Sequence, residues 1–141
     1  MRFMIIRKAD AETEAGALPT QELVTAMMKY NQELIDAGLM KGGEGLQPTS
    51  KGARVSFSGG RPTVIDGPFT EAKELIAGYT IIDVPSLQDA IEWARRWPVE
   101  DAHGHVELEI RQAYTAEDFG EFTPEIREME ERLRAINEQQ Q

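Results

Sequence analysis

Three groups of side chains in this sequence of 141 residues have the types and spacing that acid/base chemistry or ligand binding requires. The first is centred on Asp66, which ends a short apolar run directly before Gly67-Pro68. A carboxylate at such a turn can act as a general base or accept a hydrogen bond from a ligand. It can also cap the backbone amides that follow the turn. Asp66 is therefore the first catalytic candidate, with capping as the alternative.

The side chains that follow Asp66 are candidates for ligand binding. The aromatic ring of Phe69 can fill the core or form the wall of a pocket. Glu71, Lys73 and Glu74 form a charged cluster within one turn or loop. In solvent such charges pair with one another and contribute about 1 kcal/mol or less. A role in a pocket requires that they be partly buried.

The two histidines of the chain, His103 and His105, form the second group. A predicted strand over residues 105–111 places His105, Glu107 and Glu109 on one face. Because imidazole changes its charge near neutral pH, His105 is the second catalytic candidate. His105 and Glu107 are also potential ligands for a divalent metal. Two residues in alternation are too weak a signal, and we predict no metal site.

The third group is Glu44 in the glycine-rich run of residues 42–45. Glycines allow the backbone to approach a ligand closely, or they mark a bulge in a strand. We include Glu44 among the candidate ligand-binding residues. The run lacks the Lys-Ser or Lys-Thr pair of a phosphate-binding loop, and the sequence has no dinucleotide fingerprint. We therefore expect no organic cofactor.

The elements that must position these groups follow from the periodicity of apolar residues. Helices are predicted over about 21–37 and 86–97, and strands over 2–8, 39–47, 54–58, 63–66, 78–84 and 105–111. Without the hairpin at Gly59-Gly60, this order is the split βαβ, ferredoxin-like pattern of an α+β protein with an antiparallel sheet. Both helices should cover one face of the sheet. The open face predicts a homodimer, with a monomer covered by its own C-terminal helix as the alternative.

A further helix is predicted at the C-terminus. Thr123 can cap it and Pro124 suits its first position. Its narrow apolar stripe should be buried on its own domain, across the dimer or on a partner protein, and comprises Ile126, Met129, Leu133 and Ile136. We divide the chain into a domain over residues 1–114 and a helical extension over residues 115–141.

Charge and composition exclude several classes of function. The net charge is −10, and residues 117–141, with eight acidic residues and three arginines, contribute half of it. Nucleic acids and anionic membranes are bound through Lys and Arg, so neither is an expected partner. The chain has no cysteine and no apolar stretch long enough to be a signal sequence or a membrane span. A cytoplasmic protein is expected.

Residues 64–79 resemble the signature of the DGPF proteins of the YCII-related family, which is close to D-G-P-F-x-E-x-K-E-x-x-x-G-[FY]. The matching positions here are Asp66, Gly67, Pro68, Phe69, Glu71, Lys73, Glu74, Gly78 and Tyr79. The resemblance extends over residues 1–112 and includes segments 90–98 and 103–111. The proline that often follows the closing strand is replaced by Gln112.

The resemblance implies a ferredoxin-like fold assembled as a dimeric α+β barrel, with a pocket beside the barrel that has been suggested as an active site. Many simpler relatives pair a histidine in or near the first helix with an aspartate. Helix 21–37 has no histidine, so this pair is not carried over. We predict a dimeric protein that binds a small molecule and is a candidate acid/base enzyme. The alternative is a regulatory or protein-interaction module that uses the acidic C-terminal helix.

Overall fold

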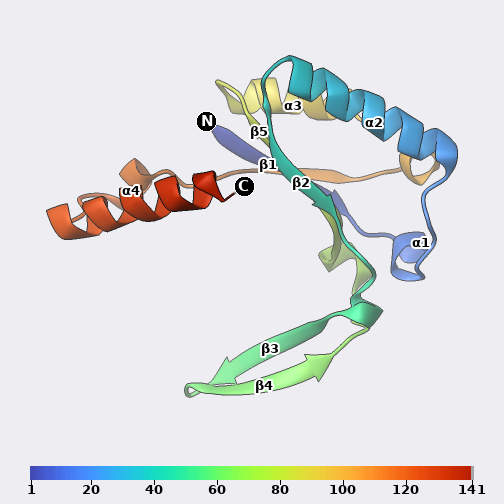
Figure 1. Ribbon diagram of the computed structural model, residues 1–141. Helices are drawn as coiled ribbons and strands as arrows, with labels where there is room; N and C mark the ends of the chain where they lie inside the picture. Colours follow the sequence, from blue (N-terminus) through green and yellow to red (C-terminus); the bar gives the residue numbers. More distant parts are fainter. Residues whose placement is uncertain (141) are drawn as a thin grey trace.

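A four-stranded antiparallel sheet forms the centre of the protein, and its strands lie in the order β2-β5-β1-β6. The structure is a computed structural model that describes residues 1–140. The strands are β1 (Arg2–Lys8), β2 (Met40–Gly45), β5 (Ile76–Asp83) and β6 (Leu108–Gln112). The helices α2 (Gln21–Asp36) and α3 (Leu87–Arg95) both cover the same face of the sheet (Figure 1). The predicted fold class, an α+β ferredoxin-like sheet, is confirmed.

Local signals in the sequence set the limits of these elements. The Thr20 side chain accepts a hydrogen bond from the backbone N–H of Leu23 and so caps α2. Gly38, with φ of +73°, ends the same helix in the left-handed conformation that glycine adopts without strain. In β2, which lies at an edge of the sheet, the register shifts between Met40 and Gly42, so the glycine-rich run does mark a bulge.

The core lies between the sheet and the two helices. Alternation along β1 directs Phe3 and Ile5 toward the helices, where both are almost fully buried with Leu34 and Ile82. Tyr30 of α2 packs its ring against Trp97, with the centroids 5.3 Å apart. The Tyr30 hydroxyl donates a hydrogen bond of 2.7 Å to the backbone carbonyl of Trp93 and is thereby satisfied.

Tyr30 should make the protein sensitive to alkaline pH. Burial raises the pKa of the Tyr30 phenol to about 12, an increase that the nearby Arg96 charge partly offsets. The unfolded chain loses this proton near pH 10 and the folded chain does not. The stabilisation that comes from the buried Tyr30 proton is therefore complete below about pH 10 and is lost as the pH rises from there toward about 12. The free energy of unfolding should fall by at most about 3 kcal/mol over this range.

Spectrophotometric titration of the phenolates checks this expectation. One of the three tyrosines should titrate last, and Tyr30→Phe should remove that late step. Tyr114→Phe is the control because Tyr114 is 77% exposed. A late step that survives in the Tyr30→Phe protein would contradict the prediction.

Some segments differ from the expectation. Residues 9–19, predicted as a loop, contain the short helix α1 (Ala11–Glu14), which Asp10 and Thr13 stabilise with reciprocal capping hydrogen bonds. The closing strand begins at Leu108, not at residue 105, because residues 101–104 form a 3₁₀ segment, η3, with positive φ at Ala102 and His103. The helix predicted over residues 86–97 is shorter, since α3 ends at Arg95, and its first residue, Leu87, is half exposed.

Two parts of the chain extend from the sheet in different directions (Figure 1). One is the predicted hairpin, formed by β3 (Ala53–Ser58) and β4 (Arg61–Asp66) around Gly59-Gly60, where both glycines have positive φ. The other is α4 (Pro124–Gln139), which Thr123 caps as predicted. Within residues 1–140, no helix has the combination of length and apolarity that crossing a bilayer requires.

Candidate functional site

A cavity of about 800 Å³ lies on the helix-covered face of the sheet. It is bordered by α2, by the segment around α1 that follows β1, and by the segment around η3 that follows α3. Leu23 and Met27 of α2 and Met40 of β2 give it apolar walls. Arg7 of β1 and Thr80 of β5 contribute polar groups, since alternation turns both side chains toward the helices. An apolar cavity with a few convergent polar groups has the general character of a small-molecule site.

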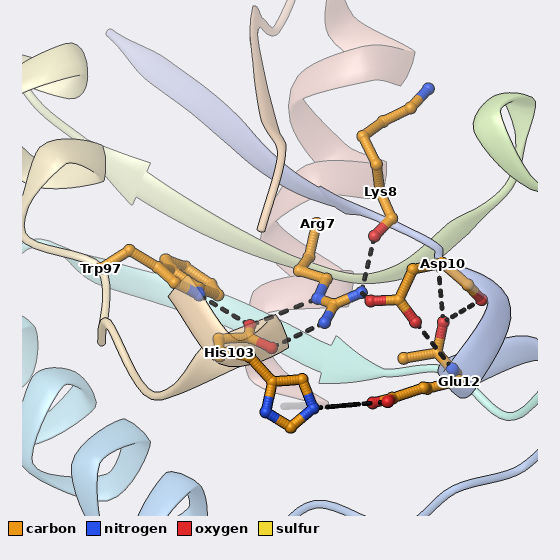
Figure 2. A network of polar contacts seen from close by, with 8 residues as sticks. Arg7, Lys8, Asp10, Glu12, Trp97 and His103 are labelled. Atoms are coloured by element: carbon orange, nitrogen blue, oxygen red, sulfur yellow. Dashed lines mark hydrogen bonds and ion pairs between the residues drawn. The ribbon is translucent and has the colours of Figure 1, made fainter. Parts of the chain in front are cut away.

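Arg7 is the centre of the polar wall, and its side chain is only 10% exposed. Its Nε donates to Oδ2 of Asp101 at 3.2 Å, and its Nη2 donates to Oδ1 of the same carboxylate at 2.6 Å. Its Nη1 donates to the backbone carbonyl of Lys8 at 2.8 Å and to Oδ2 of Asp10 at 3.2 Å (Figure 2). The Arg7 guanidinium therefore connects β1 to η3 through Asp101 and to the start of α1 through Asp10.

Two carboxylates determine the electrostatics around this guanidinium. Burial alone would lower the pKa of Arg7, but the hydrogen bonds and charge of Asp101, followed by those of Asp10, raise it above its ordinary value. For Asp10, partial burial opposes ionisation. The Thr13 backbone N–H and the Arg7 charge outweigh it and lower the pKa of Asp10. Arg7 and Asp10 are thus both charged near neutral pH.

Asp101 is fully engaged by its neighbours. It is 5% exposed, and besides the two bonds from Arg7 it accepts a hydrogen bond of 2.9 Å from the indole Nε1 of Trp97. Because three fixed donors hold its two oxygens, Asp101 is suited to holding the cavity wall in place and poorly suited to removing a proton from a ligand. Because Asp101 is the first residue of η3, its hydrogen bonds also hold the start of this segment, which contains His103, against the sheet.

His103, two residues after Asp101, lies at the rim of the cavity. Its Nε2 lies 3.2 Å from the Glu12 carboxylate, which projects from α1 (Figure 2). A carboxylate only accepts, so it selects the tautomer with the proton on Nε2 and leaves the lone pair of Nδ1 free. The backbone at Ala102 and His103 has φ of +50° and +56°, a conformation that non-glycine residues rarely adopt. Such backbone often occurs at functional sites.

The wall also contains an unpaired polar atom. Oδ1 of Asn31, on α2, is buried and has no hydrogen-bond partner within residues 1–140. A buried acceptor without a partner costs about 1–3 kcal/mol, and such atoms are rare in folded proteins.

The candidates identified from the sequence do not all meet at this cavity. Glu44 lines it, although alternation in β2 assigns its side chain to the opposite face of the sheet from that of Thr80. The others lie elsewhere: Asp66, Glu71, Lys73, Glu74 and His105 are exposed, and Phe69 is half-buried. His105 is not in a strand, so the predicted face shared by His105, Glu107 and Glu109 is incorrect. The ligand-binding and catalytic roles proposed for these residues remain predictions.

The Asp66-Gly67-Pro68-Phe69 turn has a clear structural role. The backbone N–H of Phe69 donates to the Thr49 hydroxyl at 3.0 Å, and that hydroxyl donates to the Glu14 carboxylate at 2.6 Å. The guanidinium of Arg54 lies over the Phe69 ring at 3.9 Å. The Gly67–Pro68 peptide bond is cis, and a Cβ at Gly67 would lie 1.7 Å from the Thr49 carbonyl oxygen. The turn thus fastens the hairpin to α1.

Sequence reasoning missed the Arg7 network. Its signal is that Arg7 continues the inward-facing series of Phe3 and Ile5, so that a charge falls at a buried strand position where it needs a partner. Nothing in the sequence identifies Asp101 as that partner, 94 residues away. Within the described residues, no group of three or more His, Cys, Asp and Glu side chains is arranged to hold a metal ion.

Comparison with known proteins identifies the family. The chain is 36% identical over 75 residues to the uncharacterized protein R00369 of Rhizobium meliloti (strain 1021), a match that covers 53% of this chain and 57% of that relative. This chain thus matches just over half the length of the curated relative. A similar solved structure is 5-chloro-2-hydroxyhydroquinone dehydrochlorinase (TftG) from Burkholderia phenoliruptrix AC1100, in complex with 2,5-dihydroxybenzoquinone. The TM-score between the two structures is 0.45 and their sequence identity is 14%. The match covers 84% of this chain and 98% of the dehydrochlorinase chain. The sequence model of the YCII-related domain matches residues 1–113, and the chain therefore belongs to the YCII-related family.

Proposed function

We propose that this protein binds a small organic molecule in the cavity beside Arg7 and catalyses proton transfer on it, with His103 as the general base. The observation that carries the proposal is the pairing of His103 with Glu12 at the rim of a cavity of about 800 Å³. One ring nitrogen pairs with the Glu12 carboxylate, with both side chains largely exposed, and the other nitrogen is available to accept a proton, as a general base requires.

The other residues of the cavity have supporting roles in this proposal. The apolar side chains of Leu23 and Met27 contact the body of the ligand, while Arg7 and Thr80 orient its polar groups. Arg7 does not act as an acid, because its pKa is raised by Asp101 and Asp10. We further propose that the protein is a homodimer, because β1 and β5 carry the half-buried apolar residues Met4, Ile6 and Ile81 on the face that no helix covers.

A ligand screen by thermal shift tests the location of the site. A ligand present at about 100 times its Kd should add about 2.7 kcal/mol to the stability of the wild-type protein. Leu23→Trp should abolish the shift because the indole would occupy part of the cavity. Val24→Trp is the matched control, since Val24 is the next residue in α2, is exposed and does not line the cavity.

The same screen compares this cavity with the turn at Asp66. A hit that Leu23→Trp abolishes and Asp66→Asn retains supports the cavity. A hit that Asp66→Asn abolishes and Leu23→Trp retains would overturn our proposal and favour Asp66 as the ligand anchor.

Proton transfer is tested on any hit that has an acidic C–H bond. Incubation in D₂O with the protein should exchange that hydrogen for deuterium, and NMR follows the loss of its signal. Removal of a general base reduces the rate by about 10²–10⁴-fold, so His103→Gln should nearly abolish exchange. His105→Gln, which alters the other exposed histidine, should retain it. Equal rates in the two variants would refute the role of His103.

A further inference from the structure

The β3–β4 hairpin has one apolar face that the rest of the described chain leaves uncovered. The register pairs Val55 with Val64 and Phe57 with Pro62, which places these four residues on the same face of the ribbon. Val55 is 56% exposed, Phe57 69% and Val64 66%. A two-stranded hairpin is only marginally stable in water unless a further element packs against it. This face therefore requires an additional layer.

Helix α4 also has an apolar side that is not covered by the rest of the described chain. Its apolar residues occur at helical spacing along one side, and each is roughly half exposed: Ile126, Met129, Leu133 and Ile136. Within residues 1–140, α4 makes no extended contact with another element, and β3 and β4 make extended contact only with each other. An amphipathic helix gains most of its stability by burying such a stripe.

The two surfaces match in length, and the segments that carry them have opposite net charges. Sixteen residues of α-helix span about 24 Å, and six-residue strands span about 20 Å. Segment 51–66 has three basic residues and one acidic residue, a net charge of +2. Helix α4 has five glutamates and three arginines, a net charge of −2. Alternation places Arg54 and Arg61 on the face of the ribbon opposite Val55 and Phe57, so these charges border the contact and do not enter it. The opposite net charges of the two segments still favour the approach of a helix to a hairpin over that of two hairpins or two helices.

We propose that α4 of one chain packs across the apolar face of the β3–β4 hairpin of a second copy of this chain, and that the second copy returns the same contact. Each chain supplies one helix and one hairpin, so a twofold dimer satisfies both surfaces of both chains and leaves neither open. This inference does not depend on the cavity or on His103.

Disulfide trapping tests the contact directly because the chain contains no cysteine of its own. Phe57→Cys is made in a chain enlarged by an affinity tag, and Met129→Cys in an untagged chain. The two proteins are unfolded together, refolded as a mixture and treated with a mild oxidant. The expected product on a non-reducing gel is a covalent dimer of one tagged and one untagged chain. The matched control pairs Ser56→Cys, on the other face of the ribbon, with Glu131→Cys, on the other side of α4, and should give little of it.

Several results would overturn the proposal. Covalent dimers formed only between two Phe57→Cys chains or only between two Met129→Cys chains would show that like surfaces pair. A single chain carrying both substitutions that closes an internal disulfide and stays monomeric would show that α4 covers its own hairpin. Absence of any mixed product, with light scattering still reporting a dimer, would show that the dimer forms through the open sheet face alone.

Discussion

Replacing Asp101 with alanine is expected to lower the free energy of unfolding by about 3–5 kcal/mol, the usual cost of leaving a buried charge without its partner. The Arg7 side chain is 10% exposed and would lose both hydrogen bonds to Asp101, while Asp10 could compensate only through Nη1. The indole N–H of Trp97 would lose its acceptor as well. Urea unfolding at one fixed protein concentration measures the change.

Asp83→Ala is the matched control. Asp83 is also an ion-paired aspartate, bonded to the N-terminal amine of Met1 at 3.0 Å, but its side chain is 43% exposed. An exposed pair contributes about 1 kcal/mol or less, so this substitution should change stability little. If Asp101→Ala and Asp83→Ala cost the same, the Arg7–Asp101 pair would not be the buried anchor described above.

The double variant Arg7→Met/Asp101→Ala measures how much of the loss comes from the interaction between Arg7 and Asp101 itself. Removing both charges leaves no buried ion without a partner, so the double variant should be more stable than Asp101→Ala alone. The difference from additivity gives the coupling between the two residues. Because Arg7 also binds Lys8 and Asp10, part of the loss should remain in the double variant.

The sheet and its two helices could be predicted because each rests on signals within a few residues. Thr20 and Gly38 mark the two ends of α2, and Gly59-Gly60 marks the hairpin. The alternation of Phe3 and Ile5 with Met4 and Ile6 defines a central strand. Local capping, turn chemistry and hydrophobic period all indicate the same elements, which is why the fold class followed from the sequence.

The candidate site could be predicted only in small part because its contacts are long-range. Arg7 and Asp101 are separated by 94 residues, and Glu12 and His103 by 91. The choice between the two histidines depended on where the last strand begins. Positive φ at Ala102 and His103 shortens that strand and turns His103, not His105, toward the cavity. Histidine is among the non-glycine residues enriched at positive φ, but only a few per cent of non-glycine residues adopt it and alanine is not among the enriched types, so the sequence did not predict this backbone.

The motif at Asp66 shows that a sequence signature can locate an important segment without revealing its role. Its spacing matches a family signature, which marks it as important without saying how. In the structure, Gly67 and Phe69 fasten the hairpin through Thr49 to Glu14 of α1. A structural reason for the glycine and the aromatic ring is therefore available whether or not Asp66 also binds a ligand.

Gly67→Ala is accordingly expected to release the hairpin from α1. The added Cβ would lie 1.7 Å from the backbone oxygen of Thr49, far inside contact distance, and backbone cannot move aside as a flexible side chain can. The turn must shift, so the hydrogen bond from Phe69 to Thr49 should be lost with the one from Thr49 to Glu14. Overpacking of this kind costs about 1–3 kcal/mol and sometimes more.

Trypsin provides the measurement because the released segment contains cleavable bonds after Lys51 and Arg54. Mass spectrometry should show faster cleavage at these bonds in Gly67→Ala than in wild type, with cleavage after the buried Arg7 unchanged. Gly42→Ala is the control, since a Cβ there would meet no atom within 4 Å. Because local opening sets the rate of cleavage, equal rates in both variants would mean that the Gly67 contact does not hold the hairpin in place. The close approach of Gly67 to Thr49 would then give no structural reason for the glycine of this motif.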